Sequence, residues 1–387
     1  VYTLINRTNI INNLYIKDIN KNMKLECSVE KIKNAVYQAE RVTGKNLTLP
    51  VLNSILLVAE GKVLKIRSTN LNIGIEITIP AKIEKNGILA VSGSVLNAVF
   101  SNMFQNESVF MEGKDGNLLI KTKKSQILVK GQPHEDFPTI PNVSGNEFEI
   151  ESKKLTDGIK SVYYSSTASD IKPEISSVYI YTNNTNLVFV STDSFRLAEK
   201  SIKTKGVGDI TGIIIPLKNV VEILKTFNDA DEIIKISFNK NQISFSSDNI
   251  YLTSRVIDGI FPDYRQIIPK TSNTEVVVLK QDLLNSIKIS NVFSDKFNQV
   301  NLKISPKENV FELSSTNNDI GENKTYLDAV LKGENIELGF NYKYFLDCFQ
   351  SINTDSISIK FSGASKPIVI SPVSDPSFTY LIMPMNR

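Results

Sequence analysis

One short pattern occurs three times in the chain: VLKIRSTN at residues 63–70, LVFVSTD at residues 187–193 and VFELSSTN at residues 310–317. Each copy begins with a run typical of a strand and ends in Ser-Thr-Asn or Ser-Thr-Asp, which is typical of a turn. The threonines of the three copies are 123 and 124 positions apart. Such regular spacing predicts a threefold internal repeat with roughly 120 residues in each unit.

Helix-like stretches keep the same register as this pattern. One precedes each copy, at residues 30–41, 152–165 and 280–292, and another follows it, at 92–103, 216–227 and 341–352. Apolar or small residues recur in the first set at i, i+3 and i+4, the spacing of a helix with one buried face. Ser152 is placed to cap its helix, and Pro216 to occupy a first helical turn, where its missing N–H costs nothing.

The rest of each unit reads as short strands separated by Asn, Asp and Gly turns. The predicted fold is therefore α+β, with three repeated domains that each pack two helices on antiparallel sheets. We predict domains at residues 23–145, 146–272 and 273–387. Residues 1–22 stand apart, because they lack a clear period and the features of a signal peptide. We interpret them as an N-terminal extension, disordered or arising from a mis-assigned start codon, with a genuine extra arm as the alternative.

Composition bounds the class of protein. The chain has 387 residues, 41% of them hydrophobic and 22% charged, which is ordinary for globular domains. It contains no run of 18 apolar residues, so we expect no membrane partner. Cys27 and Cys348 match no metal-ligand spacing and are interpreted as buried thiols in a reducing, cytoplasmic compartment. A net charge of +3 is close to neutral, so a surface that faces nucleic acid must come from the distribution of charge.

Catalytic motifs are missing from the sequence. His134 is the single histidine, which rules out an HExxH site and leaves any Ser-His-Asp triad dependent on it. We interpret His134 as a loop residue. We find no GxGxxG, GxxxxGK[ST] or GxSxG pattern, and we predict no catalytic residue, metal site or cofactor. Two alternatives remain: an enzyme with an unrecognised site, and a monomeric DNA-binding or scaffold protein of repeated β-rich domains.

Lysines and arginines lie outside the apolar stripes of the predicted helices. A solvated helix face explains them in the ordinary way, whereas a diffuse surface facing phosphates would bind duplex DNA without reading its sequence. The helix at 92–103 has no Lys or Arg, so such a lining would be uneven. The DNA-facing candidates are Lys31, Lys33, Arg41, Lys45, Lys153, Lys154, Lys160, Lys172, Lys218, Lys225, Lys280, Lys288 and Lys343.

Five segments, taken in order, resemble a known family. They are LTLPVL at residues 47–52, DFPTIP at 136–141, STDSFRLA at 191–198, DGIFPDYR at 258–265 and YLIMPM at 380–385. On these motifs and the threefold repeat, the chain from Met23 onward resembles the beta subunit of bacterial DNA polymerase III, the sliding-clamp family. The resemblance implies that two chains join head to tail into a six-domain ring that encircles duplex DNA and confers processivity on the polymerase.

The resemblance also implies partners and a site for them. The partners are the replicative polymerase alpha subunit, the clamp loader and other clamp-motif proteins of replication and repair, held as a short peptide between the second and third domains. The implied pocket residues are Ile175, Thr192, Ser194, Phe195, Arg196, Leu197, Pro262, Gln266, Ile267, Asn341, Tyr344, Pro367, Met383, Pro384 and Met385. The implied homodimer joint sets Ile127 and Val129 against Val292 and Phe293. Departures from the family pattern at Ser194-Phe195, Gln266 and residues 386–387 bear on peptide preference.

Overall fold

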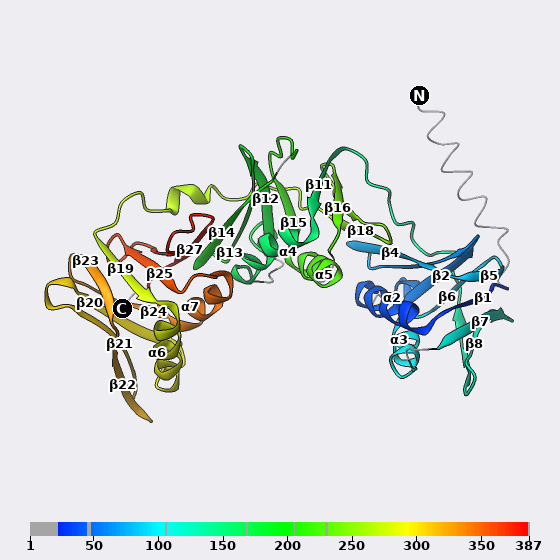
Figure 1. The fold of residues 1–387 in the computed structure, drawn as a ribbon, viewed down its shortest axis with the longest axis horizontal. Coiled ribbons are helices and arrows are strands. Elements are labelled where there is room, and N and C mark those ends of the chain that lie inside the picture. Colours follow the sequence, from blue (N-terminus) through cyan, green and yellow to red (C-terminus); the bar gives the residue numbers. More distant parts are fainter. Residues whose placement is uncertain are drawn as a thin grey trace. The chain divides into compact units, whose positions relative to one another are not determined.

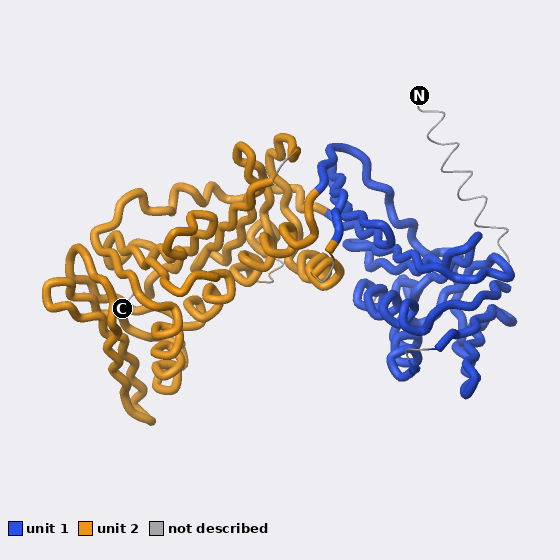
Figure 2. The backbone as a smooth tube through the Cα atoms, in the orientation of Figure 1, with its two compact units in different colours: residues 1–149, 232–255 blue, residues 150–231, 256–387 orange. Residues whose placement is uncertain are grey.

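The computed structural model describes residues 22–44, 48–104, 107–167, 169, 171–204, 206–228 and 231–385. The chain forms two compact units (Figure 2). Unit 1 comprises residues 1–149 and 232–255, and unit 2 comprises residues 150–231 and 256–387. Some positions discussed in the sequence analysis lie outside the described residues. They are residues 1–21 of the predicted extension, the DNA-facing candidate Lys45, and residues 386–387.

Unit 1 is built on two antiparallel sheets (Figure 1). The five-stranded sheet has the order β5 (Lys82–Lys85), β1 (Lys24–Ser28), β7 (Ser108–Lys114), β8 (Asn117–Lys121) and β9 (Gln126–Val129). The nine-stranded sheet has the order β10 (Gly131–Gln132), β6 (Gly87–Ser92), β2 (Ser54–Glu60), β3 (Val63–Thr69), β4 (Ile73–Pro80), β18 (Ile250–Arg255), β17 (Gln242–Ser246), β16 (Ile233–Phe238) and β11 (Asn146–Glu151). The pairing of β4 with β18 thus brings residues 233–255 into a sheet formed mainly by residues 54–92.

Two helices, α2 (Val29–Val42) and α3 (Gly93–Ser101), pack against each other in unit 1, and a 3-10 turn η1 spans Pro50–Asn53. The helix α2 buries Val29, Ile32, Val36 and Ala39, which recur every three or four residues and so share one face. Cys27 is buried beside this helix, and desolvation raises the pKa of its thiol to about 12. The predicted buried thiol is confirmed, as it is for Cys348.

Unit 2 joins two sheets through its helices (Figure 1). The nine-stranded sheet has the order β15 (Ile213–Pro216), β12 (Ser177–Asn183), β13 (Asn186–Thr192), β14 (Arg196–Lys203), β27 (Phe378–Ile382), β26 (Ile368–Pro372), β25 (Ser356–Phe361), β19 (Thr274–Leu279) and β23 (Ala329–Gly333). The four-stranded sheet has the order β22 (Gly321–Tyr326), β21 (Val310–Asn317), β20 (Gln299–Ser305) and β24 (Ile336–Asn341).

The helices of unit 2 pack in pairs, α4 (Ser152–Lys160) with α5 (Leu217–Phe227) and α6 (Lys280–Val292) with α7 (Tyr342–Cys348). Short 3-10 turns complete the unit. They are η2 (Tyr163–Ser165), η3 (Tyr264–Ile267), η4 (Pro306–Glu308) and η5 (Phe349–Ser351). The pairing of β14 with β27 is central, because it makes one continuous sheet from residues 177–216 and 274–382.

The six α-helices of the described residues lie where the sequence predicts them, but three local predictions are wrong. Ser152 is the first helical residue and Glu151 the N-cap, because the Ser152 hydroxyl donates instead to the carbonyl oxygen of Phe227, 2.7 Å away. Pro216 ends β15 and precedes α5 rather than lying in its first turn. The predicted helix at 152–165 is also shorter, since α4 ends at Lys160 and a separate 3-10 turn follows.

The repeated Ser-Thr-Asn/Asp pattern is a strand end that continues into a turn. The serines Ser68, Ser191 and Ser315 are buried, and each hydroxyl donates to a backbone carbonyl oxygen at 2.5–2.9 Å. In the first two copies, the threonine hydroxyl donates to the carbonyl oxygen four residues later. The next side chain, Asn70 or Asp193, accepts from the two amides that follow the turn. The pattern recurs because each domain turns the chain in the same way.

Among the described residues, no helix is long and apolar enough to cross a membrane. The same residues contain no group of three or more His, Cys, Asp or Glu placed to hold a metal ion. His134 lies in a loop, as predicted, with its side chain largely buried.

Candidate peptide-binding site

A tight turn between β13 and β14 shapes the centre of the predicted site. The side chain of Asp193 accepts hydrogen bonds from the amides of Phe195 and Arg196, both at 2.9 Å. The hydroxyl of Thr192 donates to the carbonyl oxygen of Arg196 at 2.7 Å, and Ser194 takes a left-handed conformation with φ 76°. Because the turn is held at both ends, it directs Phe195 outward, where the ring is 60% exposed.

Arg196 holds residues of the second and third predicted domains together. Its Nε donates to Asp193 Oδ2 at 3.0 Å, and an Nη donates to Asp347 on α7. The guanidinium group lies over the ring of Tyr344, 4.7 Å from its centroid. Only 10% of the Arg196 side chain is exposed, so the two carboxylates are its main compensation for the loss of water. We call Asp193, Arg196, Tyr344 and Asp347 the arginine clasp.

The C-terminal segment crosses this site as an ordered strap. After β27 ends at Ile382, the amide of Met383 donates to the carbonyl oxygen of Phe195, and the amide of Met385 to that of Gly339, both at 2.8 Å. The strap therefore bonds to the turn before β14 at one end and to β24 at the other. Both ends of residues 383–385 are thus fixed by backbone bonds, and the Met383 side chain remains 36% exposed.

The connector at residues 256–273 contributes a second wall. Phe261 and Tyr264 are buried against Leu197 and Leu381, whereas Pro262, Gln266 and Ile267 are exposed beside them. Of the remaining predicted pocket residues, Asn341 caps α7 by accepting from the amide of Lys343, Ile175 is half-buried in its loop, and Pro367 is buried just before β26. The structure thus places Thr192–Leu197, Asn341, Tyr344 and residues 383–385 around the ends of β13, β14, β24 and β27 within unit 2.

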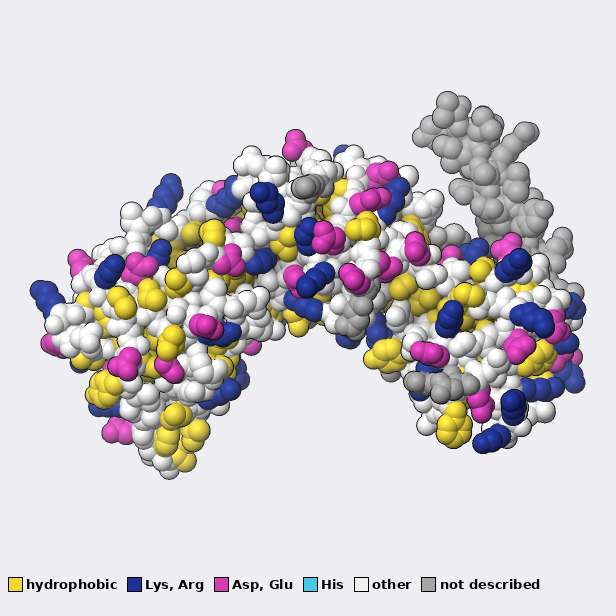
Figure 3. All heavy atoms as spheres, in the orientation of Figure 1, with side chains coloured by type: hydrophobic (Ala, Val, Ile, Leu, Met, Phe, Trp, Pro, Cys, Tyr) yellow, Lys and Arg dark blue, Asp and Glu magenta, His cyan; other side chains and the backbone are white. Residues whose placement is uncertain are grey.

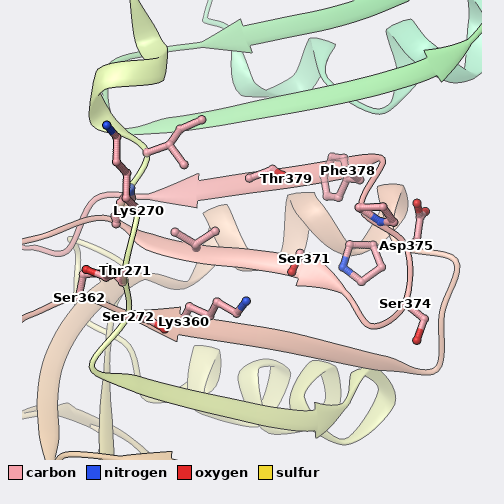
Figure 4. Close-up of a pocket in the computed structure, with 15 residues that line it drawn as sticks. Lys270, Thr271, Ser272, Lys360, Ser362, Ser371, Ser374, Asp375, Phe378 and Thr379 are labelled. Atoms are coloured by element: carbon pink, nitrogen blue, oxygen red, sulfur yellow. The ribbon is translucent and has the colours of Figure 1, made fainter. Parts of the chain in front are cut away.

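A cleft of about 510 Å³ lies next to this site (Figure 4). Connector residues 268–272 form one wall, and side chains of β25, β26 and β27 form the floor, including Lys360, Ser371 and Thr379. None of the predicted site residues lines it. Its lining combines polar residues, prolines and a few apolar side chains from residues 268–272 and 360–379, which share no sequence pattern, so the sequence carried no signal for it.

All but two of the basic candidates lie on the described helices. Lys172 lies in the loop before β12, and Lys45 is outside the described residues. Several of them contact neighbouring groups of the protein. Lys33 donates to Ser101 O at 2.8 Å and Lys280 to Ile352 O at 2.6 Å. Lys154 and Lys225 form ion pairs with Glu151 and Glu222, and Arg41 lies over the ring of Tyr37. The exposed candidates are Lys31, Lys153, Lys160, Lys172, Lys218, Lys225, Lys288 and Lys343. On the face in Figure 3, acidic side chains are interspersed with basic ones.

Two of the predicted joint residues, Ile127 and Val129, lie on an edge strand, and the other two lie at the end of α6, which contacts the edge strand β22. The strand β9 is the last of the five-stranded sheet in unit 1, and β22 is the last of the four-stranded sheet in unit 2. Val129 is only 4% exposed, so it packs inside its own domain, whereas its neighbour Leu128, which the sequence analysis did not name, is 54% exposed. Val292 is exposed at the end of α6, and Phe293 is half-buried.

Three family models match the chain. They describe the N-terminal domain of the DNA polymerase III beta subunit at residues 23–141, the central domain at 149–263 and the C-terminal domain at 265–386. The chain belongs to the DNA polymerase III beta subunit family. Members of this family are non-catalytic processivity factors of DNA polymerase, so the predicted class, three clamp domains and no enzyme, is confirmed.

Relatives and solved structures agree with this family. The beta sliding clamp of Synechococcus elongatus is 26% identical over 372 residues, which are 94% of this chain and 99% of that protein. The beta sliding clamp of Staphylococcus aureus is 28% identical over 349 residues, 88% of this chain and 93% of the relative. The crystal structure of the Bacillus subtilis sliding clamp has a TM-score of 0.90 at 24% identity, covering 95% of this chain and all of that one. Beta subunits of this family thus share the whole three-domain fold.

Proposed function

We propose that two copies of this chain close head to tail into a ring around duplex DNA and tether the replicative polymerase alpha subunit, the clamp loader and other motif-bearing proteins of replication and repair. The observation that carries the proposal is the match of three consecutive beta-subunit domains to one chain. In addition, each unit contains a sheet with an unpaired edge strand, β9 in unit 1 and β22 in unit 2. The domains of the ring are those at residues 23–145, 146–272 and 273–387, and the protein acts in the cytoplasm.

The open edges support the joint. An exposed edge strand presents unpaired N–H and C=O groups, which a second chain can satisfy. A head-to-tail joint uses two different surfaces, here β9 of one copy and the end of unit 2 of the other. Ile127, Leu128, Val292 and Phe293 supply apolar surface there, with the backbone of Val129 completing the edge. Figure 3 shows hydrophobic side chains over the end of unit 2 that carries β22.

The dispersed lysines suit a clamp that slides. A nearly neutral chain with exposed lysines scattered over its helices attracts phosphates weakly and without sequence preference. Retention by enclosure does not require tight contacts, and tight contacts would slow movement along DNA. We assign the main DNA-facing role to the candidate lysines whose side chains are exposed to solvent.

The arginine clasp, the strap and the connector together suit a short peptide. Phe195, Ile267 and Met383 offer exposed apolar surface around a rigid polar centre, which is the usual composition of a specific binding site. Methionine adapts to ligands of different shape, which favours several partners at one site. Phe195 and Gln266 then set which peptides this clamp prefers.

The mass in solution tests the ring first. Multi-angle light scattering should give a mass near twice 43.2 kDa. Leu128→Asp should shift the protein towards monomer, because it places a charge on the open edge. Ile233→Asp is the matched control, since both side chains are 54% exposed in unit 1 and Ile233 lies away from β9. A wild-type monomer, or equal effects of the two substitutions, would contradict the proposed joint.

Loading onto DNA tests enclosure. A clamp loaded on closed circular DNA by a clamp loader should stay bound at about 1 M NaCl, where charges are screened within roughly 3 Å, and leave after the circle is cut. The scaffold alternative predicts loss from circular and linear DNA at the same salt concentration.

A further inference from the structure

A chain of hydrogen bonds fastens the connector to the sheet of unit 2. An Nη of Arg265 donates to the hydroxyl of Tyr181 at 2.7 Å. The hydroxyls of Tyr181 and Tyr264 are 2.7 Å apart, and Tyr264 also bonds to the carboxylate of Glu199. Tyr181 belongs to β12 and Glu199 to β14, whereas Tyr264 and Arg265 begin η3. The connector is thereby held across three adjacent strands.

The chemistry of the end groups fixes the direction of the whole chain. A guanidinium can only donate, and an ionised carboxylate can only accept. Tyr264 must therefore donate its proton to Glu199, and Tyr181, which accepts from Arg265, must donate to Tyr264. Every hydroxyl donates once and accepts once, so the bonds polarise one another between a cation and an anion. Burial, together with the neighbouring carboxylate, raises the pKa of Tyr264, which keeps its proton in place.

Aromatic packing supports the same contact. The ring of Phe261 stacks on that of Tyr179, with centroids 4.7 Å apart and planes 6° apart. Phe261 also meets Tyr264 edge to face at 6.2 Å. Both connector rings are buried among Leu197, Leu381 and neighbouring side chains. The connector is thus fixed by packing as well as by directed bonds.

The turn η3 carries two anchored residues and two site residues. Tyr264 and Arg265 are bonded to the sheet, while Gln266 and Ile267, the next two residues of the same 3-10 turn, are exposed at the candidate site. The turn is closed by backbone bonds from Tyr264 N to Pro262 O and from Ile268 N to Arg265 O. Any rotation of η3 therefore moves Gln266 and Ile267 together.

We propose that Tyr264 is a positioning residue for the peptide site: through Glu199 and Tyr181 it holds η3 in the orientation that presents Ile267 and Gln266 to a bound peptide. This inference rests on the proposed function of the site. Tyr264 does not itself touch the peptide, since its side chain is buried beneath the connector.

The test uses the full chain and a fluorescent synthetic peptide that carries the clamp-binding motif of a DNA polymerase III alpha subunit. Tyr264→Phe keeps the ring and removes only the hydroxyl, and Glu199→Gln removes the charge that orients the chain. Both should weaken peptide binding by about three- to tenfold, as expected for losing a directed hydrogen bond that orders part of a site. The amides of residues 264–268 should exchange hydrogen faster in both variants.

Tyr179→Phe is the matched control. It removes a phenolic hydroxyl from the same aromatic cluster, where that hydroxyl donates to Thr211 O at 3.2 Å outside the chain of bonds. Unchanged peptide affinity in this variant, with weakened binding in the other two, supports the proposal. If the wild type binds the peptide and Tyr264→Phe binds it equally well, the proposal is overturned and the peptide site stands. If the wild type does not bind, the peptide site is wrong and the positioning role falls with it.

Discussion

Replacing Arg196 with alanine should be among the more damaging single changes in unit 2. The guanidinium lies between Asp193, whose side chain is 8% exposed, and Asp347, which is 41% exposed. Removing one partner of a buried ion pair generally costs about 3–5 kcal/mol, because a charge is left without compensation. Asp193 retains two amide donors at 2.9 Å, which lowers that cost. We therefore expect the free energy of unfolding to fall by about 3 kcal/mol.

Asp347 provides the internal comparison. Because water reaches its carboxylate, Asp347→Asn should cost no more than about 1 kcal/mol. The double variant should cost less than the sum of the two single changes, since both remove the same bond. Arg196→Lys keeps the charge but cannot reach two carboxylates with a planar fork, so it should fall between wild type and Arg196→Ala.

Urea denaturation followed by far-ultraviolet circular dichroism would measure these free energies of unfolding. Because the two compact units need not unfold together, the variants are compared at the transition that the Arg196 substitutions shift. The reasoning is refuted if Arg196→Ala is as mild as Asp347→Asn, or if the two effects add fully. Either result would mean that water, rather than the two aspartates, compensates the guanidinium group.

Three further predictions follow from other contacts. Truncation that removes residues 383–387 should abolish binding of the motif peptide and leave the dimer intact; unchanged affinity by fluorescence anisotropy would remove the strap from the site. Ellman's reagent at pH 8 should find neither Cys27 nor Cys348 in the native protein and both in guanidinium chloride, because both thiols are buried with raised pKa values; rapid native labelling would disprove that burial. Gly158→Ala, normally favourable in a helix, should lower the melting temperature, because a Cβ there would lie 2.4 Å from the Phe189 ring; a higher melting temperature would show that the ring moves aside.

The sequence predicted most of the architecture because the repeated turn is a local feature. The hydroxyl of Thr69 and the side-chain oxygen of Asn70 bond to backbone groups within four residues, so the same letters recur wherever the same turn is made. The Ser68 hydroxyl instead bonds to the carbonyl oxygen of Ala39, 29 residues away. The helix positions were predicted from the periodic spacing of apolar residues, which follows directly from the need of each helix to bury one face. The cap at Ser152 failed for the opposite reason, because a distant carbonyl in α5 competes for its hydroxyl.

The candidate site was recovered in part, and the missing part depends on contacts between distant residues. The turn at Asp193 follows from the sequence, but the bond from Arg196 to Asp347 joins positions 151 residues apart that share no pattern. The same holds for the connector, where Tyr181, Glu199 and Tyr264 meet only after the sheet has formed. At the predicted joint, the side chain of Val129 on β9 is buried and that of Leu128 is exposed. The strand is too short and too uniformly apolar for the sequence to show which of the two side chains faces solvent.

The ladder between β4 and β18 has a consequence for partial digestion. Chain segments leave unit 1 at residue 149, return at 232 and leave again at 255. Residues 250–254 are paired with residues 73–77 by backbone hydrogen bonds, so a protease that nicks a loop anywhere in 150–231 cuts the covalent chain without freeing either fragment. A digest of this kind should show two bands on a denaturing gel and an undiminished mass by light scattering, and a nicked preparation would pass for intact protein in any assay that reads size alone.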